Sequence, residues 1–342
     1  MISMSNILIE RVTVLGGGGW GTALAVHLAR LGKHVKLWAR DEDLVADLIA
    51  TRVNSVYLGG VKLPASVQPI NDLQLGLRDA QCIVSAVPSH GTRDVIRRAK
   101  PFIPLDAVLV SATKGLEEGT LLRMTAVIEQ ELGVGHPVAV LSGPSFSLEL
   151  ARELPTAVSV ASHCADVVAA VQHNFRSRYF RLYATEDVVG VEIGGAMKNV
   201  IAIAAGVVES LGLGDNARSA LITRGLAEIS RLAVAVGGRR QTLSGLSGLG
   251  DLVLTCTGRL SRNRSVGIEL GKGHDLNTVL SEMKSVAEGV RTTDVALALG
   301  SKHGVELPIT AQMGDVLTGR KEPRVAVEDL MLRRQRPEVD VE

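Results

Sequence analysis

Short apolar runs alternate with amphipathic stretches through the first half of the chain. Six of the apolar runs are predicted to be buried strands: Val12–Leu15, Val35–Trp38, Cys82–Val87, Val108–Ala112, Val138–Ser142 and Thr156–Ala161. Stretches with helical periodicity lie between them, including Thr22–Leu31, Leu44–Thr51 and Leu121–Leu132. Strands separated by helical crossovers form a parallel sheet covered on both faces. The pattern therefore predicts an α/β domain with a doubly wound, parallel sheet.

The pattern changes near residues 185–192. A last predicted strand covers Arg181–Tyr183, and the apolar positions then recur with helical spacing. The helices predicted here are Val188–Leu211, Asn216–Val236, Ser261–Leu270, Val290–Lys302, Pro308–Leu317 and Arg324–Arg333. We expect a doubly wound first domain, an all-helical second domain and a frayed tail, over residues 1–188, 189–334 and 335–342.

Length and composition agree with two globular domains. The chain has 342 residues, of which 46% are hydrophobic, enough for two sizeable cores. Lys and Arg number 37 and Asp and Glu 36, so the net charge is +1 at pH 7. This balance gives no support to nucleic acid as a partner.

Cysteine usage and the apolar runs indicate the compartment. Cys82, Cys164 and Cys256 are too scattered for a disulfide framework and lack the spacing of zinc ligands. Met1–Ile9 lacks the basic segment and long apolar stretch of a secretory signal. The most apolar run, Val200–Val208, is about half as long as the ~18–20 residues of a membrane span. We expect a cytoplasmic protein with no stable membrane insertion.

A glycine-rich loop follows the first predicted strand. Gly16, Gly18 and Gly21 match the pattern G-x-G-x-x-G, with a strand before the loop and a helix after it. In that context the first glycine makes a tight turn, the second lets a pyrophosphate approach the backbone, and the third lets helix and strand pack closely. Free N–H groups at the helix N-terminus bind the phosphates. The loop predicts a dinucleotide-binding Rossmann domain.

The end of the second predicted strand indicates which dinucleotide is bound. A carboxylate here hydrogen-bonds the ribose 2′-hydroxyl of NAD, whereas an arginine accommodates the 2′-phosphate of NADP. The chain has Arg40 at this point, followed by Asp41, which we interpret as the N-cap of the next helix. NADP(H) is therefore the preferred cofactor and NAD(H) the alternative.

Three further groups of residues suit a ligand site. Lys114 follows a predicted strand, at the edge where open α/β sheets bind ligands. Lys198 lies in a long apolar helix, one turn after small residues, and these surroundings favour a function over a solvated surface charge. Further on, Asp251 precedes a predicted helix start that offers donors for a phosphate, at Ser261, Arg262 and Asn263. Taken alone, that start could also be an ordinary capped basic helix end.

Eight motifs run in order along about residues 10–330: Gly16–Gly21, Val87–His90, Thr113–Glu117, Ser142–Phe146, Gly195–Asn199, Gly248–Leu252, Ser261–Arg264 and Glu288–Gly289. Together they resemble the motifs of bacterial NAD(P)-dependent glycerol-3-phosphate dehydrogenases. The resemblance implies reversible reduction of dihydroxyacetone phosphate, a small phosphorylated substrate, to sn-glycerol 3-phosphate, which feeds glycerophospholipid synthesis. It also implies a homodimer.

The resemblance assigns roles to individual residues. The family's catalytic lysine, which accepts a proton when the alcohol is oxidised, falls on Lys198. Positions that contact the substrate fall on Lys114, Gly143, Ser145, Lys198, Asp251, Ser261, Arg262 and Asn263. Positions that contact the cofactor, besides the loop glycines Gly16, Gly18 and Gly21, fall on Gly19, Trp20, Arg40, Lys114, Ser147, Arg262, Val286 and Glu288. Two departures from the family pattern are Gly19, often Ser, and Leu148, commonly Lys.

Hydride transfer to a ketone explains these residue types. Negative charge builds on the carbonyl oxygen, and a cationic donor stabilises that charge and delivers a proton. We expect Lys198 to be this donor, with Lys114 assisting, so that no metal is needed. Neighbouring cations are expected to lower the pKa of Lys198. Asp251 is expected to orient one ammonium, and Arg262 to hold the phosphate.

Two other functions stay open on the sequence. A β-hydroxy-acid dehydrogenase of similar two-domain build would use Arg262 for a carboxylate, but Ser142–Ser145 and Leu249–Asp251 argue against it. A non-catalytic, NADP(H)-binding redox sensor would need no proton donor, and the presence of both Lys114 and Lys198 argues against that function.

Overall fold

The computed structural model describes residues 8–283, 286–335 and 337–338, and its first half contains one eight-stranded sheet. The strands are β1 (Arg11–Leu15), β2 (His34–Trp38), β3 (Val67–Ile70), β4 (Cys82–Ser85), β5 (Val108–Ser111), β6 (Val138–Ser142), β7 (Thr156–Ala161) and β8 (Phe180–Thr185). Their order is β3-β2-β1-β4-β5-β6-β7-β8, so the direction of winding reverses between β1 and β4. Open α/β sheets bind ligands at such a switch point.

Helices cover both faces of this sheet, which confirms the doubly wound arrangement. They are α1 (Gly19–Arg30), α2 (Glu42–Thr51), α3 (Leu73–Leu77), α4 (Ser89–Ala99), α5 (Met124–Leu132), α6 (Ser147–Ala151) and α7 (Ala165–Phe175). Helices α1, α6 and α7 share one hydrophobic core with the sheet, and α3, α4 and α5 share another. Alternate residues of a strand serve the two cores, because successive side chains point to opposite faces: Val110 of β5 joins the first core and Leu109 the second.

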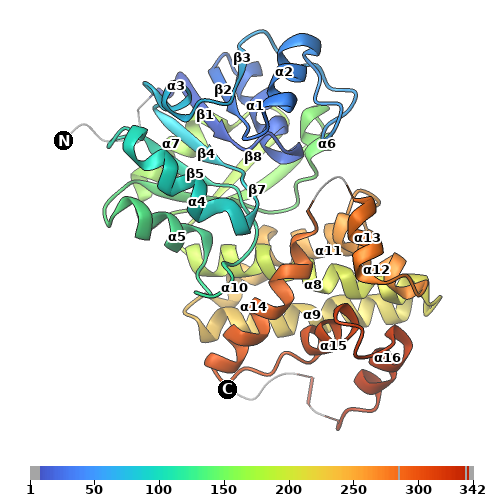
Figure 1. The fold of residues 1–342 in the computed structure, drawn as a ribbon. Coiled ribbons are helices and arrows are strands. Elements are labelled where there is room, and N and C mark those ends of the chain that lie inside the picture. Colours follow the sequence, from blue (N-terminus) through green and yellow to red (C-terminus); the bar gives the residue numbers. More distant parts are fainter. Residues whose placement is uncertain (1–7, 284–285, 336, 339–342) are drawn as a thin grey trace.

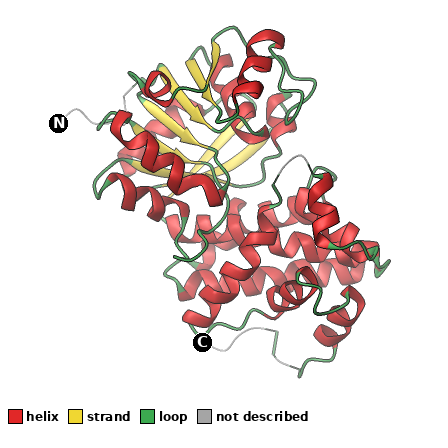
Figure 2. Cartoon of the chain, viewed as in Figure 1, coloured by secondary structure: helices red, strands yellow, loops and turns green. Residues whose placement is uncertain are grey.

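The second half is helical throughout the part that the structure describes. Its helices are α8 (Val188–Ser210), α9 (Gly214–Ala235), α10 (Arg240–Leu243), α11 (Asp251–Thr257), α12 (Arg262–Gly271), α13 (Leu276–Glu282), α14 (Glu288–Lys302), α15 (Pro308–Leu317) and α16 (Pro323–Met331). The long helix α8 contacts α9, α11, α12 and α14, and it also packs against β6 and β7. Figure 1 shows the helical domain stacked below the sheet domain, and Figure 2 shows that strands are confined to the upper domain.

Three sequence predictions about the first domain are corrected. The sheet is not parallel throughout, because β7 runs antiparallel to β6. The five-residue helix α6 joins these strands, and at ~1.5 Å rise per residue it is too short to carry the chain back along the sheet. The strand expected to reach Val87 ends at Ser85, and the helix expected from Leu121 begins at Met124. Leu121 has a left-handed φ of 62°, which helical backbone does not adopt.

Helix α8 corrects the expectation that the most apolar run is too short to cross a membrane. The sequence prediction considered Val200–Val208, but the helix has 23 residues and is long and apolar enough to cross a membrane by length and composition alone. Of its most apolar window, 94% is buried inside the protein. Core helices pass the same test, and the neighbours of α8 already cover its apolar surface, so no membrane insertion is indicated. Residues 336 and 339–342 of the predicted frayed tail lie outside the described part.

Candidate active site

The glycine loop joins β1 to α1, and its three glycines have different surroundings. Gly16 has a φ of 120°, and a Cβ there would lie 2.7 Å from the Ala86 carbonyl oxygen. A Cβ on Gly21 would collide with the Gly16 carbonyl oxygen, whereas one on Gly18 would meet nothing within 4 Å. Helix α1 begins at Gly19 with no side-chain cap on its N–H groups. Open space beside uncapped N–H groups fits the pyrophosphate of a dinucleotide.

Arg40 lies directly after β2, close to this loop. Its side chain is exposed and makes no hydrogen bond or ion pair with any residue that the structure describes. Asp41 caps helix α2, because its Oδ1 accepts a hydrogen bond from Leu44 N at 3.1 Å. The interpretation of Asp41 as an N-cap is therefore confirmed, and the Arg40 guanidinium is uncommitted at the place expected for a ribose phosphate.

The other predicted cofactor residues are spread over both domains. A Cβ on Gly19 would lie 3.6 Å from Ser147 Oγ, so these two residues are neighbours. The same Cβ would lie 2.8 Å from the Tyr57 carbonyl oxygen, so a serine at this position would require the backbone to shift. Trp20 packs against the first core, and its Nε1 is buried without a hydrogen-bond partner. Val286 is half-buried, two residues before α14.

Two lysines from different domains meet on one carboxylate. Lys114, which follows β5, donates to Asp251 Oδ2 at 2.6 Å, and Lys198 of α8 donates to Oδ1 at 2.7 Å. Asp251 begins α11 and is only 1% exposed. Lys198 Nζ also donates to Thr255 Oγ1 at 2.8 Å, one turn further along α11. Asp251 therefore orients both ammonium groups rather than the one expected from the sequence.

Burial sets the charge state of Lys198. The residue is 7% exposed, and desolvation, the largest effect, lowers its pKa to about 8. The Asp251 carboxylate raises this pKa and the Lys114 ammonium lowers it. The sequence argument expected the direction of the shift but gave neighbouring cations as its cause, whereas burial contributes more. A lysine with a pKa near 8 can both give and take a proton close to neutral pH.

The loop after β6 brings a carbonyl and a hydroxyl to Lys114. The Gly143 carbonyl oxygen accepts a hydrogen bond from Lys114 Nζ at 2.7 Å, and Ser145 Oγ lies 3.3 Å from the same nitrogen. Ser145 Oγ also donates to the Gly143 carbonyl oxygen at 2.9 Å. The structure thus joins five predicted substrate residues in one hydrogen-bonded group: Lys114, Gly143, Ser145, Lys198 and Asp251.

The start of α12 holds the other three predicted substrate residues. Ser261 is the N-cap, and its Oγ accepts a backbone N–H of the first turn at 3.2 Å. Asn263 is buried: its Nδ2 donates to Asn199 Oδ1, and its Oδ1 accepts from Gly289 N, both at 2.9 Å. Arg262 is exposed, with no hydrogen bond or ion pair to the described part of the chain. The segment is therefore a capped helix start that also leaves forked donors available to an anion.

Two functional contacts involve residues that sequence reasoning did not assign. Glu288, at the start of α14, accepts hydrogen bonds from Ser89 N at 2.9 Å and Ser89 Oγ at 2.5 Å. Thr255 binds Lys198, as described above. Thr255 could have been found, because it lies four residues after Asp251 and hence on the same helix face. Nothing local to Ser89 indicates its partner, which comes from the other domain.

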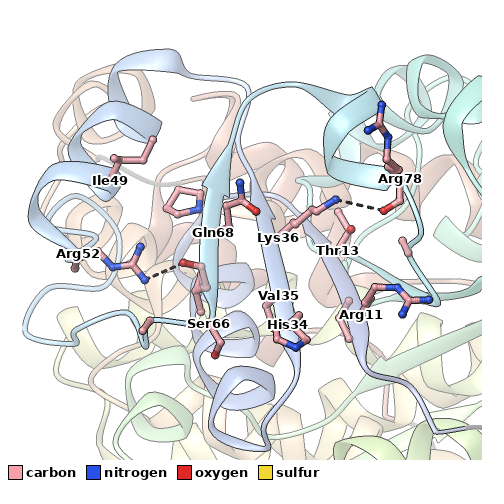
Figure 3. Close-up of a pocket in the computed structure, with 15 residues that line it drawn as sticks. Arg11, Thr13, His34, Val35, Lys36, Ile49, Arg52, Ser66, Gln68 and Arg78 are labelled. Carbon is pink, nitrogen blue, oxygen red and sulfur yellow. Dashed lines mark hydrogen bonds between the residues drawn. The ribbon is translucent and has the colours of Figure 1, made fainter.

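A surface hollow of about 630 Å³ lies elsewhere, on the outer face of β1, β2 and β3 (Figure 3). Its basic lining residues are Arg11, His34, Lys36, Arg52 and Arg78. Lys36 Nζ donates to the carbonyl oxygens of Leu75 and Arg78, and Arg52 Nη2 to those of Pro64 and Val67. Lys36 thus binds the end of α3, and Arg52 binds the segment that leads into β3, so we assign these cations a structural role and do not assign this hollow to the active site.

Comparison with known proteins divides the chain in the same way as its fold. Residues 11–168 match the family described as NAD-dependent glycerol-3-phosphate dehydrogenase N-terminus, and residues 187–328 match the C-terminus of that dehydrogenase. The chain belongs to this family. The matched regions contain the glycine loop, Lys114, Lys198, Asp251 and Arg262.

Individual relatives match over nearly the whole chain. A protein of Koribacter versatilis named glycerol-3-phosphate dehydrogenase (NAD(P)+) is 49% identical over 335 residues, which cover 97% of this chain and 99% of the relative. A Myxococcus xanthus protein of the same name is 50% identical over 331 residues, covering 96% and 99%. The crystal structure of glycerol-3-phosphate dehydrogenase from Coxiella burnetii has a TM-score of 0.92 at 42% identity, covering 95% and 99%. The family and the fold expected from the sequence are thus confirmed.

Proposed function

We propose that the protein catalyses the reversible reduction of dihydroxyacetone phosphate to sn-glycerol 3-phosphate by hydride transfer with NAD(P)H, a reaction that feeds glycerophospholipid synthesis. The observation that carries this proposal is the convergence of Lys114 and Lys198 on Asp251. It gathers two ammonium groups beyond the carboxyl end of β5, at the edge where open α/β sheets bind ligands, and there they can stabilise the negative charge that develops on a ketone oxygen. Membership of the family and the names of the relatives support the same substrate.

The hydrogen bonds favour Lys198 over Lys114 as the acid–base residue. An ammonium has three donors. Lys114 uses its donors on Asp251, Gly143 and Ser145, whereas Lys198 uses two, on Asp251 and Thr255. Lys198 therefore has one donor left for a substrate oxygen. In reduction its ammonium gives a proton to that oxygen, and in oxidation the neutral amine takes the proton back.

Lys114 then acts as a fixed positive charge. Its contacts with Gly143 and Asp251 hold the ammonium in place without rearrangement during the reaction. When bound, NAD(P)H supplies the hydride. The chain's own contribution is to orient the ketone, stabilise the developing oxyanion and move one proton.

The phosphate end of the substrate is assigned to Arg262. Its guanidinium is uncommitted among the described residues and lies at the helix start that also carries Ser261 and Asn263. A forked pair of N–H donors matches a phosphate, and binding energy from this remote group helps to place the reacting carbon. We propose Ser261 and Asn263 as further contacts, together with Gly143 and Ser145 on the other side.

On the cofactor side, we propose binding along the glycine loop, with NADP(H) preferred and NAD(H) accepted. The uncommitted Arg40 side chain supports the preference, because it can pair with a 2′-phosphate. We further propose the contacts predicted from the sequence at Gly16, Gly18, Gly19, Trp20, Gly21, Lys114, Ser147, Arg262, Val286 and Glu288. In this arrangement residues 1–188 form the dinucleotide-binding domain and residues 189–334 the substrate-binding domain, and each domain also supplies some contacts to the other ligand. We also propose a cytoplasmic homodimer.

The experiment that tests this function is NADPH oxidation by the purified protein with dihydroxyacetone phosphate, run beside NADH and beside unphosphorylated dihydroxyacetone. The proposal expects turnover that depends on the phosphate and is faster with NADPH at low cofactor concentration. Absence of turnover despite NADPH binding would contradict it. A panel of β-hydroxy acids in the oxidative direction then separates the hydroxy-acid dehydrogenase from the redox sensor.

A further inference from the structure

Two carboxylates of the helical domain bind helix N-termini of the first domain. Helix α4 begins at Ser89 and α5 at Met124, and neither has a side-chain cap of its own. Glu288 binds the start of α4, and Glu192 binds the start of α5. A carboxylate in this position satisfies free N–H groups and interacts favourably with the helix dipole. The helical domain therefore caps two helix N-termini of the first domain.

The hydrogen bonds of Glu192 go only to two residues, Thr125 and Arg123, among those that the structure describes. Its Oε1 accepts from Thr125 N at 2.8 Å, and its Oε2 accepts from Thr125 Oγ1 and from Arg123 Nη1, both at 2.5 Å. The side chain is buried and its charge is paired with Arg123. None of these three residues belongs to the predicted substrate or cofactor set. Their contact explains how the domains hold together and requires no catalytic role.

The Glu288 contact has the same form but continues into the substrate site. Ser89 supplies both an N–H and a hydroxyl to the Glu288 carboxylate. The next residue of α14, Gly289, donates its N–H to Asn263 Oδ1, and Asn263 Nδ2 donates to Asn199 Oδ1. Asn199 follows the acid–base lysine on α8. Hydrogen bonds, together with the peptide bond between Glu288 and Gly289, thus connect the start of α4 to the start of α12.

The charge of Glu288 adds a second link to that end of the site. Glu288 makes no ion pair within the described part of the chain, but its charge counteracts the partial desolvation that lowers the pKa of the Arg262 guanidinium. Arg262 immediately precedes Asn263. The position in which Ser89 holds the Glu288 carboxylate therefore affects two things. One is the hydrogen bond from Gly289 N to Asn263, and the other is the electrostatic potential at Arg262, the proposed phosphate-binding residue.

We propose that Ser89 is a positioning residue for the substrate phosphate: by holding Glu288, it fixes the contact between α14 and α12 that sets Arg262 and Asn263. The inference rests on the proposed function and adds a second role to the cofactor contact expected of Glu288. Removing the Ser89 hydroxyl leaves its N–H in place, so the carboxylate is loosened rather than released. The first turn of α14 then holds Asn263 less firmly, and phosphate binding weakens.

The test is Ser89→Ala in the full-length protein, with kcat and KM measured for dihydroxyacetone phosphate and for NADPH. We expect KM for dihydroxyacetone phosphate to rise about tenfold, as for the loss of one hydrogen bond to a charged group, while kcat changes by less than about twofold and KM for NADPH rises clearly less than KM for dihydroxyacetone phosphate. In a Glu288→Ala background the same substitution should add nothing, because the hydroxyl no longer has a carboxylate to hold.

Thr125→Ala is the matched control. It removes the hydroxyl that donates to Glu192, just as Ser89→Ala removes the hydroxyl that donates to Glu288. It should lower the melting temperature and leave KM for dihydroxyacetone phosphate unchanged. The proposal is overturned if Ser89→Ala leaves that KM unchanged, if its effect is confined to NADPH, or if Thr125→Ala raises the substrate KM equally. The unmodified protein provides the separate test of function: if it does not turn over dihydroxyacetone phosphate, the proposed function itself fails.

Discussion

The two domains bring different chemistry to the site that they share. The first domain offers mainly backbone groups: the open space beside Gly18, the uncapped N–H groups of α1 and the Gly143 carbonyl oxygen. The second offers buried charge, with Lys198 and Asp251 at 7% and 1% exposure. Backbone dipoles suit a ligand whose charge is constant, whereas a proton must be moved by a side chain whose pKa burial can shift. The first domain is therefore suited to binding the cofactor, and the second to transferring the proton.

Lys114 is the point at which the two kinds of contribution meet. It is a side chain of the first domain, yet it binds the second domain's Asp251 as well as its own domain's Gly143. All three of its donors are engaged, so it behaves as a fixed charge. Substitutions should therefore have distinguishable kinetic effects: loss of turnover or substrate affinity at Lys198, Asp251 and Arg262 of the second domain, and loss of cofactor affinity at the glycine loop and Arg40 of the first.

The largest effect is expected for Lys198→Ala. Removing the acid–base residue should lower kcat by about 10²–10⁴-fold, the usual contribution of such a group. NADPH binding, measured by fluorescence titration, should stay within a few-fold because its phosphates contact the first domain. A variant that retains turnover would remove Lys198 from its role and break the division between the domains.

Asp251→Asn sharpens the comparison by changing charge without changing shape. The Asp251 carboxylate raises the pKa of Lys198, so its loss should lower that pKa below about 8 and leave less ammonium to donate a proton. We expect kcat for reduction to fall about 100-fold, the lower end of the range for acid–base catalysis. The falling limb of its pH profile should also move to lower pH. A limb that stays in place would show that Asp251 does not control this lysine.

Arg262→Ala should affect the phosphorylated substrate most strongly. Losing a bidentate, charge-assisted contact with the phosphate should raise KM for dihydroxyacetone phosphate by about 10–100-fold. The rate with unphosphorylated dihydroxyacetone should not change, since it has no phosphate to lose. Steady-state kinetics with both ketones measure the difference, and equal effects on both would remove Arg262 as the anchor.

Arg40→Ala should give the smallest effect and the one specific to the first domain. KM for NADPH should rise about tenfold, as for one surface contact to a phosphate, while KM for NADH stays constant. Initial rates at saturating dihydroxyacetone phosphate measure both values. Parallel changes for the two cofactors would mean that Arg40 does not contact the 2′-phosphate.

The fold is predictable from the sequence wherever the signal is local. Apolar runs locate most strands of the sheet, but not β3, a four-residue edge strand that contains Pro69. Proline is tolerated at an edge, so this strand carries little of the usual pattern. The antiparallel direction of β7 is equally hidden, because it depends on how the short helix α6 packs. Topology of this kind is set by contacts between segments, which a local pattern does not contain.

The candidate site shows the same limit at the level of side chains. Position at a strand end singles out Lys114, and apolar surroundings single out Lys198. Their common partner, Asp251, is in the predicted set, but its bridging geometry follows from how α11 packs against α8. The pairing of Ser89 with Glu288 joins residues from two domains. Sequence therefore indicates the candidate site residues, and tertiary packing decides which of them touch.

The most direct test of the central claim is the pH dependence of kcat/KM in both directions. Lys198 has its pKa lowered to about 8, mainly by burial, and it must be neutral to take a proton and charged to give one. The rate of sn-glycerol 3-phosphate oxidation should therefore rise as pH increases through about 8 and then level off. The rate of dihydroxyacetone phosphate reduction should fall over the same interval. Profiles that are flat between about pH 7 and 10 in both directions would contradict the assignment of proton transfer to the buried lysine of the helical domain.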